Sequence, residues 1–529
     1  MIALSRVALL TLLVAVEPNR TLGPISTHLA PAAPTALIVA TATKSTVAIS
    51  WTSAAGTKIV VERKSLGSAW PVATPAAAAA AASTPTPTPS TIAIVTATTA
   101  TDSKIDQYAT YVYRVRAQGA DNLLSAPSNE VIAGPPPVGM TSVIATPKAM
   151  QAHDPQNFAT QMRMAFDAND DPTIVYMTND LNNDGELDDT DLSVITWNRA
   201  RYKWNAPVSI DTVGNVTRSG TRMPFSFTRD QSTGQFGLLH TIGEHELRLS
   251  TSDDNGLTWK HLRVETSGAE QGGFSTPSIA MAGGRVFLAY AFGNDAVIYR
   301  TGLVTDAPTK WTSTKAPVPS GQELKTEGIN ARLDAAGKPV VTYLLSGDSY
   351  NTNVMLWRPD VNKSVKIMDT RNIQNDDPGL DLQIQGTQLA VAFYGALDDK
   401  FFANHHIWFA HSTDNGATWT AAVAVADDGG NAMGPPATVS LDHAGHAAMF
   451  ANVDGGNDGQ AKCGAPKLMR SADGVKWTTC SPDTKGAPAT SDAVFPVGAF
   501  AGNDKLYVAF KARQGAPSLA PGLVLWRER

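Results

Sequence analysis

From about residue 140 to the C-terminus, short apolar runs alternate with polar turns in a pattern that repeats. Each unit contains an apolar run, a turn rich in Gly or polar residues, and an alternating strand that ends at a bulky residue. Alternation of apolar and polar residues is typical of a half-buried β-strand, and no long stretch shows the period of a helix. The end residues, 50 to 63 positions apart, are Met177, His240, Tyr290, Tyr343, Phe393, Phe450 and Phe510.

The length of the repeat predicts the architecture of this region. About four short strands in each unit of about fifty residues make one blade of a β-propeller, in which repeated sheets pack around an axis. The seven units therefore predict a seven-bladed propeller over residues 140–529. The last unit, Ala493 to Trp526, is one strand short. The run Thr141 to Thr146 is the expected replacement, which would close the ring and cover two sheet edges.

A different set of strands occupies residues 31–134, which we expect to form a separate domain. Short strands at 33–39, 47–51, 57–63 and 111–117, closed by the run at 125–131, predict a sandwich of two sheets. Trp51, the Tyr-x-Tyr-Arg-Val-x-Ala run and the Ser-Ala-Pro-Ser-Asn-Glu run resemble those of fibronectin type III domains. The alanine run 76–82 and the Pro-Thr repeat after it predict a surface insertion, and the proline-rich residues 135–139 predict a stiff linker.

Two copies of the motif Ser-x-Asp-x-Gly-x-x-Trp lie in the repeat region, and a third copy is one residue shorter. The Asp carboxylate in such a turn accepts hydrogen bonds from nearby amides, the Gly permits a left-handed backbone, and the Trp packs against the hairpin. The motifs resemble the Asp-boxes, or BNR repeats, of the sialidase superfamily, which implies a sialidase-like propeller. The residues expected to have this structural role are Ser252, Asp254, Gly256, Trp259, Ser412, Asp414, Gly416, Trp419, Ser471, Asp473 and Trp477.

The net charge of the chain argues against two classes of partner, and its N-terminal residues indicate where the protein is located. Charged residues make up 17% of the chain and the net charge is −6, so nothing favours binding to nucleic acid or an anionic membrane. Residues 1–25 contain Arg6 followed by an apolar run at 7–16, too short to span a bilayer but long enough for the core of a signal peptide. We expect a monomer that is secreted, periplasmic or held at the cell surface, without a membrane segment after signal removal.

The cysteines, Cys463 and Cys480, flank the shortened Asp-box on the two strands that its turn should join. Equal reach on either side of a hairpin can bring two residues opposite each other, and an oxidising compartment favours a disulfide. The alternative is a pair of unpaired buried thiols.

An acidic insertion in the first repeat, residues 180–191, carries the spacing of a calcium loop. Oxygen side chains fall at positions 1, 3, 5, 9 and 12, a backbone carbonyl would serve at position 7, and Gly185 lies at position 6. The loop resembles EF-hand and dockerin loops, although a strand follows where those families have a helix. The predicted ligands of this structural calcium are Asp180, Asn182, Asp184, Glu186, Asp188 and Asp191; the alternative is an acidic solvated turn.

The resemblance to sialidases implies a site on the propeller axis, with three arginines for a sugar carboxylate, a Tyr–Glu nucleophile and an Asp acid/base. Arg222 and the Met-Pro pair after it resemble the motif of the first arginine, but they lie in the second repeat, and no motif supplies the other two. The starts of the innermost strands should line the axis. They supply the catalytic candidates Arg222, Arg163, Glu327, Asp377 and Asp492.

Two functions follow from this incomplete set of residues. The first is an exported recognition protein that binds a glycan or protein through the propeller face, with the fibronectin module as spacer or adhesion unit. The second is a glycoside hydrolase of exo-sialidase type that acts on acidic or neutral glycans.

Overall fold

The computed structural model describes residues 30–70, 90–144, 162–178, 191–213, 225–243, 245–268, 273–293, 296–346, 351–371, 380–395, 406–426, 433–453, 466–480, 493–512 and 522–529. Two compact units are present, one formed by residues 1–38, 48–101 and 112–131 and the other by 39–47, 102–111 and 132–529. Within the described ranges the regular structure is β-strand apart from a 3₁₀ helix at Pro308–Lys310. No helix in these ranges is long and apolar enough to cross a membrane.

The strands nearest the N-terminus form two sheets, with the orders β1–β2–β5 and β4–β3–β6–β7. Trp51 of β2, Ile59 and Val61 of β3, and Tyr113 and Val115 of β6 are buried. These residues follow the predicted alternation, so the expected strands at 33–39, 47–51, 57–63 and 111–117 are largely present. The bounds are β1 (Thr35–Ala42), β2 (Val47–Thr52), β3 (Lys58–Ser65), β4 (Ser90–Val95), β5 (Thr99–Asp102), β6 (Tyr111–Gln118) and β7 (Val131–Ala133).

The strand predicted at 125–131 is wrong for most of its length, because β7 begins only at Val131. Two serines explain the difference. Ser125 Oγ accepts a hydrogen bond from the Ala117 amide at 2.9 Å, and Ser128 Oγ accepts one from the Val115 amide at 3.1 Å. Hydroxyl groups thus bond to the edge of β6 in addition to the backbone, and the segment departs from a regular ladder.

In the second unit, the described residues form seven antiparallel sheets of four or five strands each. The first four sheets are β9 (Met162–Phe166), β10 (Pro172–Thr178), β11 (Asp191–Asn198), β12 (Lys203–Trp204) and β13 (Val208–Thr212); β14 (Phe225–Arg229), β15 (Phe236–Ile242), β16 (Glu246–Ser252) and β17 (Lys260–Thr266); β18 (Phe274–Ala282), β19 (Arg285–Phe292), β20 (Ala296–Leu303) and β21 (Thr312–Lys315); and β22 (Glu323–Leu333), β23 (Pro339–Ser346), β24 (Asn351–Arg358) and β25 (Lys363–Arg371). The other three are β26 (Asp381–Gln385), β27 (Gln388–Gly395), β28 (His406–Ser412) and β29 (Val423–Ala426); β30 (Met433–Leu441), β31 (Ala447–Val453), β32 (Pro466–Ser471) and β33 (Thr478–Cys480); and β34 (Ala493–Phe500), β35 (Leu506–Ala512), β36 (Gly522–Arg527) and β8 (Gly139–Ile144).

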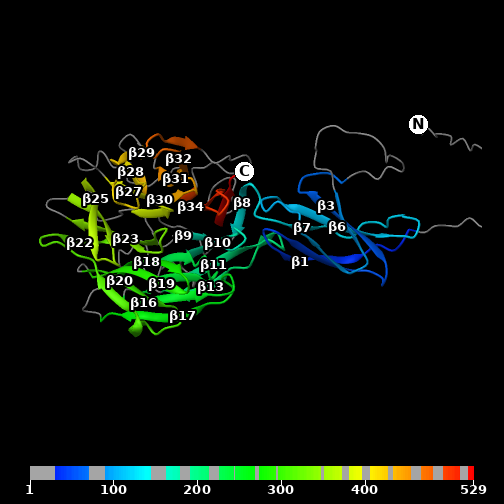
Figure 1. The fold of residues 1–529 in the computed structure, drawn as a ribbon, viewed down its shortest axis with the longest axis horizontal. Helices are drawn as coiled ribbons and strands as arrows, with labels where there is room; N and C mark the ends of the chain where they lie inside the picture. The colour runs from blue at the N-terminus through cyan, green and yellow to red at the C-terminus, as the bar shows by residue number, and fades with distance from the viewer. Residues whose placement is uncertain are drawn as a thin grey trace, which may run out of the picture. The chain divides into compact units, whose positions relative to one another are not determined.

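The sheets follow one another around a centre. The first strand of each sheet contacts the first strand of the next, in the order β9, β14, β18, β22, β26, β30 and β34, and β34 contacts β9. In Figure 1 the colours of this unit accordingly pass from green through yellow to red around the middle of the unit. The second unit is therefore a propeller-like array of antiparallel sheets.

The last sheet takes its outer strand from the beginning of the unit. β8 pairs antiparallel with β36, with Trp526 opposite Met140 and Val524 opposite Ser142. The sequence-based expectation for the segment that starts at Thr141 is thus confirmed for the residues up to Ile144. The pairing covers the outer edge that β36 would otherwise expose.

The bulky residues that end the alternating runs lie on the second strand of each sheet and form the core. All seven have at most 2% of their surface exposed. Side chains of adjacent sheets meet around them, as Phe450 of β31 does with Val508 and Phe510 of β35. One of the seven, His240 on β15, is polar and fully buried.

Candidate functional site

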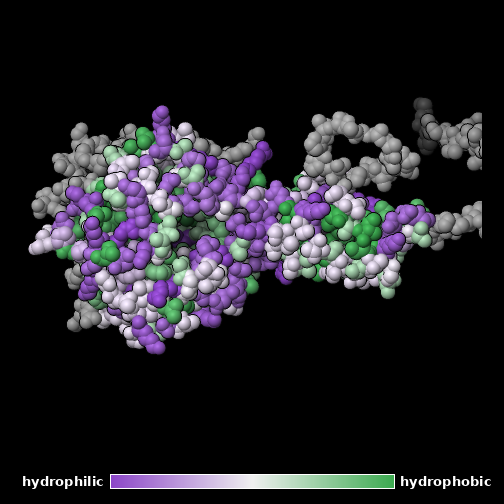
Figure 2. All heavy atoms as spheres, viewed as in Figure 1, coloured by the Kyte–Doolittle hydropathy of each residue, from purple (hydrophilic) through white to green (hydrophobic). Residues whose placement is uncertain are grey.

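A cavity of about 440 Å³ occupies the centre of the second unit. Its lining comes from the first strands of all seven sheets, β9, β14, β18, β22, β26, β30 and β34. Figure 2 shows one face of the unit, which is largely hydrophilic and is hollowed near its middle. Because every sheet contributes to the lining, residues far apart in sequence meet here.

Polar side chains join neighbouring first strands around the cavity. The innermost strands belong to separate sheets, so backbone ladders do not connect them. Side chains bond to the backbone of the next strand instead, and this fixes the shape of the lining. The bonds join Ile279 N to Ser226 Oγ (3.3 Å), Ala331 N to Ser278 Oγ (2.8 Å), Asn330 Nδ2 to Leu380 O (2.7 Å) and Val439 N to Asp381 Oδ2 (3.0 Å).

Asp381 gives this series a charge and connects it to two arginines. Arg332 Nη2 lies 3.4 Å from Asp381 Oδ1, and Arg332 Nη1 donates to the carbonyl of Ala331 at 3.0 Å. Arg163, from β9, donates to the carbonyl of Met162 at 2.8 Å. Burial lowers the pKa of Arg163 to about 10 and also lowers the pKa of Arg332, while the Asp381 carboxylate raises both. Both guanidinium groups therefore stay charged at neutral pH.

Phe166 supplies an apolar part of the lining. Phe225 and Phe227 also border the cavity, but they are only 1% and 8% exposed and pack in the core between sheets. The guanidinium carbon of Arg163 lies 6.0 Å from the Phe225 ring centroid. Guanidinium groups can bind carboxylate, sulfate or hydroxyl oxygens, and a ring face can pack against the C–H groups of a ligand. Among the described lining residues Asp381 is the single carboxylate. Two-step glycoside hydrolysis uses a pair of carboxyl groups.

The structure describes two of the five predicted catalytic residues. Arg163 lines the cavity. Glu327 belongs to β22, next to the irregularity between Lys325 and Asn330. The candidates Arg222, Asp377 and Asp492 lie outside the described residues.

Sequence reasoning missed Arg332 and Asp381. A signal was present, because Asp381 alternates with the buried Leu380 and Leu382 and must face away from the core between sheets. Arg332 likewise follows the buried Ala331. Both residues could have been found by looking for charged residues that lie next to buried apolar residues on the innermost strand of a sheet.

The two complete Ser-x-Asp-x-Gly-x-x-Trp motifs have nearly the same hydrogen bonds. Asp254 Oδ1 accepts from Ser252 Oγ at 2.9 Å and from the Thr258 amide at 2.8 Å, and its Oδ2 accepts from Thr258 Oγ1 at 2.6 Å. The Gly256 backbone has a positive φ of 85°, and Trp259 Nε1 donates to the Gly256 carbonyl at 3.1 Å. Ser412, Asp414, Gly416, Thr418 and Trp419 repeat these contacts. No box residue lines the central cavity within the described structure.

Of the predicted calcium ligands, Asp191 lies in the described part of the chain, and the rest of the loop does not. Asp191 is buried at the start of β11, where Oδ1 accepts from Ser209 Oγ at 2.8 Å and Oδ2 from Ser193 Oγ at 3.2 Å. Burial raises the pKa of this carboxyl. Both oxygens are thus engaged within the sheet, and the calcium site stays a prediction. No group of three or more His, Cys, Asp or Glu side chains among the described residues is arranged to hold a metal ion.

The predicted disulfide also stays a prediction. Cys480 ends β33, opposite Leu468 in the register of the hairpin. Cys463 lies outside the described residues.

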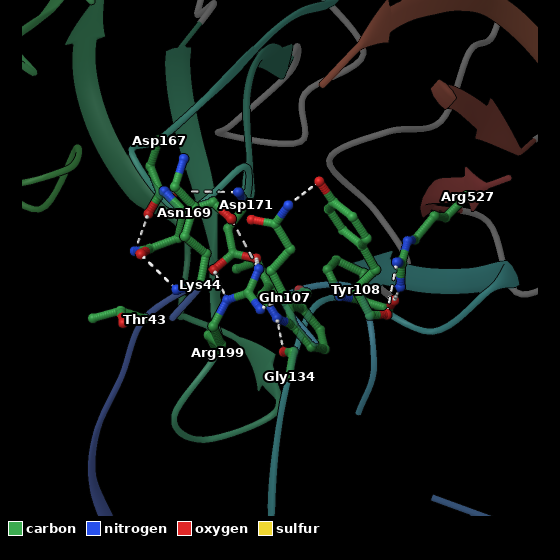
Figure 3. A network of polar contacts seen from close by, with 12 residues as sticks. Thr43, Lys44, Gln107, Tyr108, Gly134, Asp167, Asn169, Asp171, Arg199 and Arg527 are labelled. Atoms are coloured by element: carbon green, nitrogen blue, oxygen red, sulfur yellow. Dashed lines mark hydrogen bonds and ion pairs between the residues drawn. The ribbon is translucent and has the colours of Figure 1, made fainter. Parts of the chain in front are cut away.

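An ion pair that does not line the central cavity stabilises the start of the first sheet (Figure 3). Arg199 donates from Nε and Nη2 to the two oxygens of Asp171, each at 2.9 Å. Arg199 also donates to the carbonyls of Asn169 and Gln107, at 2.9 and 3.0 Å. The side chains of Arg199 and Asp171 are 4% and 3% exposed, so the fork is a buried, fully paired structural contact.

A second polar cluster surrounds His240 in the core of the second sheet. His240 Nε2 lies 3.0 Å from Ser250 Oγ, and Ser250 Oγ lies 2.8 Å from His261 Nδ1. Asp211 Oδ2, from β13 of the preceding sheet, lies 3.6 Å from His240 Nε2 and accepts from Arg248 Nη1 at 2.7 Å. Burial lowers the pKa of His240 to about 4, although Asp211 opposes the shift. His240 is therefore neutral at pH 7.

Comparison with known proteins gives structural similarities alone. No family model matches the chain, and no curated protein sequence matches it. The chain is similar to the polysaccharide lyase Uly1 (TM-score 0.44, 10% identity, 72% of this chain and 90% of that one). It is also similar to an α-L-arabinanase of Penicillium chrysogenum complexed with arabinobiose (TM-score 0.39, 11% identity, 74% and 98%). A third similar structure is the sialidase of Trypanosoma rangeli in complex with the inhibitor DANA (TM-score 0.37, 13% identity, 58% and 54%). With identities this low, a functional conclusion has to rest on the residues of the central cavity.

Proposed function

We propose that this protein recognises an acidic glycan in the central cavity of a seven-bladed, sialidase-like propeller. The observation that carries the proposal is the group formed by Arg163, Arg332 and Asp381 in that cavity. Arg332 contacts Asp381, and Arg163 borders the same cavity. A guanidinium fork matches a carboxylate or sulfate substituent of a ligand.

The shape and composition of the cavity support a sugar as ligand. Its volume of about 440 Å³ lies in the range of about 300–1,000 Å³ that is typical of small-molecule sites. Serine and asparagine side chains and the two arginines provide polar groups, and Phe166 provides apolar surface. Ligands that combine hydroxyl groups, C–H faces and a carboxylate or sulfate match this mixture.

The remaining expectations belong to the same proposal. The protein is exported, residues 31–134 form a fibronectin type III domain that serves as spacer or adhesion unit, and the loop at 180–191 holds a structural calcium. Seven sheets whose first strands contact one another in a cycle support the seven-bladed architecture. Recognition is the function that Arg163 and Arg332 of the lining support best.

The proposal can be tested on a glycan array that includes sialylated, uronic-acid and sulfated glycans beside neutral ones. Arg332→Ala removes a charge-assisted contact and should weaken binding to acidic glycans by about 2 kcal/mol, or tens of fold. Arg332→Lys should restore little, because an ammonium group lacks the planar fork. Arg201→Ala, at an exposed arginine in the turn before β12, is the matched control and should bind as the wild type does.

Acidic-glycan binding that is equal in wild type and Arg332→Ala, with both proteins folded, would overturn the proposal. A panel of fluorogenic glycosides on the same proteins tests the hydrolase alternative. If the protein hydrolyses a glycoside and the hydrolysis is lost when Glu327, Asp377 or Asp492 is replaced, its function is catalysis and not recognition alone.

A further inference from the structure

Arg358 joins the motif at 412–419 to the sheet before it. Its Nη1 donates to Asp334 Oδ2 at 2.9 Å, and its Nη2 donates to the backbone carbonyl of Asn415 in the motif. The Asn415 side chain donates to the same Asp334 oxygen at 3.0 Å. One guanidinium group thus bridges a carboxylate of the sheet β22–β25 and a carbonyl of the sheet β26–β29.

The motif at 252–259 meets the first sheet at a similar junction, where an asparagine takes the place of this arginine. Arg358 of β24 pairs with Lys363 of β25 across the turn 359–362. Asn198 of β11 pairs with Lys203 of β12 across the turn 199–202, which has the same length. Asn198 therefore corresponds to Arg358.

The two acceptors of the guanidinium group are kept at the first junction. Asp167 corresponds to Asp334, because Oδ1 of each accepts hydrogen bonds from the amides two and four residues further on, at 2.7–3.0 Å. Asn255 corresponds to Asn415, and their backbones have left-handed φ angles of 58° and 60°. The two junctions therefore share a carboxylate and an asparagine carbonyl, and they differ at Asn198.

The short Asn198 side chain leaves a pocket of about 200 Å³ at this junction. Asp167, Asn198 and Asn255 line it, and the residues of its lining belong to the second unit. Asn198 Nδ2 donates to Asn205 Oδ1 at 3.1 Å, just after β12. Asp167 Oδ2 accepts from Asn169 Nδ2 at 3.3 Å, and the Asn255 side chain has no hydrogen-bond partner in the described part of the chain. Both acceptors of the bridge are thus open to a further donor.

The arginine that follows Asn198 does not form the bridge. Arg199 also borders the pocket, but its Nε and Nη2 donate to Asp171, as the dashed lines in Figure 3 show. Its side chain is 4% exposed and fully paired, so it is held in that contact. The rim of the pocket is accessible instead, because Asn255 is exposed and 52% of the Leu257 surface is exposed. A side chain can therefore enter from outside.

We propose that this pocket, which we call the junction pocket, binds the guanidinium group of an arginine side chain from a partner protein. One Nη group donates to Asp167 Oδ2 and the other to the carbonyl of Asn255, as Arg358 does at the other junction. The exposed Leu257 packs against the methylene groups of the arginine. A planar fork reaches both acceptors at once, whereas the ammonium group of a lysine is a single point charge.

The test uses the full chain and two capped tripeptides, Gly-Arg-Gly and Gly-Lys-Gly, at millimolar concentration. Binding is followed by the NMR signal of the Asn255 amide in protein with isotope-labelled asparagine. The signal is assigned with Asn255→Gly, which the left-handed backbone permits. We expect a saturable shift with the arginine peptide and an affinity at least tenfold lower for the lysine peptide. Asp167→Asn should also weaken the arginine peptide at least tenfold, since a neutral amide replaces the charged acceptor.

Asn198→Arg supplies the guanidinium group from the chain itself, as Arg358 does. This variant should no longer bind the arginine peptide, and its melting temperature should be no lower than that of the wild type. Asp253→Asn is the matched control, because it removes the same charge as Asp167→Asn from an exposed side chain outside the described lining. It should bind as the wild type does. Absence of a saturable shift in the wild type, equal affinities for the two peptides, or equal affinities of wild type and Asn198→Arg would overturn the proposal.

Discussion

Lowering the pH should destabilise this protein through His240. The histidine is fully buried, and Asp211, Arg248 and His261 are the charged or titratable groups that face it. Burial lowers its pKa from 6.5 to about 4, so the folded chain binds fewer protons than the unfolded chain between these values. The stabilisation is complete above pH 6.5 and is lost as the pH falls towards 4. From pH 7 to pH 5, this one residue should cost about 2 kcal/mol of unfolding free energy.

The prediction is isolated by comparing two variants with the wild type. His240→Phe places an aromatic ring where five other sheets have Tyr or Phe, and it removes the titration. His245→Gln alters an exposed histidine that bonds to Ser267 and serves as control. Urea unfolding at pH 7, 6 and 5 should show a smaller loss of stability for His240→Phe than for wild type, by about 2 kcal/mol at pH 5, and no such difference for the control. If the free-energy difference between wild type and His240→Phe does not change with pH, the assigned protonation of His240 is wrong.

Three further changes have defined outcomes. Arg199→Ala should lower the unfolding free energy by about 3–5 kcal/mol, because it leaves the buried Asp171 without its partner; an unchanged urea midpoint would contradict this. Calorimetry should show that the wild type binds calcium and that Asp184→Ala binds it more weakly, as the loop sequence predicts. Equal heats of calcium binding for the two proteins would rule out Asp184 as a ligand. Mass spectrometry of unreduced peptides from exported protein should find Cys463 linked to Cys480, and two freely alkylated thiols would rule the bridge out.

The fold could largely be read from the sequence, because it depends on local alternation. The position of each bulky residue, such as Tyr290 or Phe450, follows from one strand and the turn beside it. Even the closing strand was predictable, since the last unit lacked one strand and the run after the proline linker offered one. The strand expected at 125–131 was less predictable because its serines bond to β6 through their hydroxyl groups.

The candidate site was harder to predict for a physical reason. Arg163, Arg332 and Asp381 come from three different sheets, and their meeting depends on the register of each first strand. That register shifts at irregularities such as the one between Lys325 and Asn330 in β22. The sequence does not show where such a bulge lies, so alternation alone could not identify Arg332 as a residue of the cavity lining.

The pairing of β8 with β36 also determines when the protein can finish folding. Roughly 380 residues separate the two strands, and ribosomes add about 5–20 residues per second. For about 20–80 s, β8 exists in the nascent chain without its partner, while the earlier sheets can already form. An apolar strand with an open edge attracts other chains during this interval. Production of the protein should therefore depend on chaperones that hold the emerging chain, and a cut just before residue 522 should leave a polypeptide that aggregates.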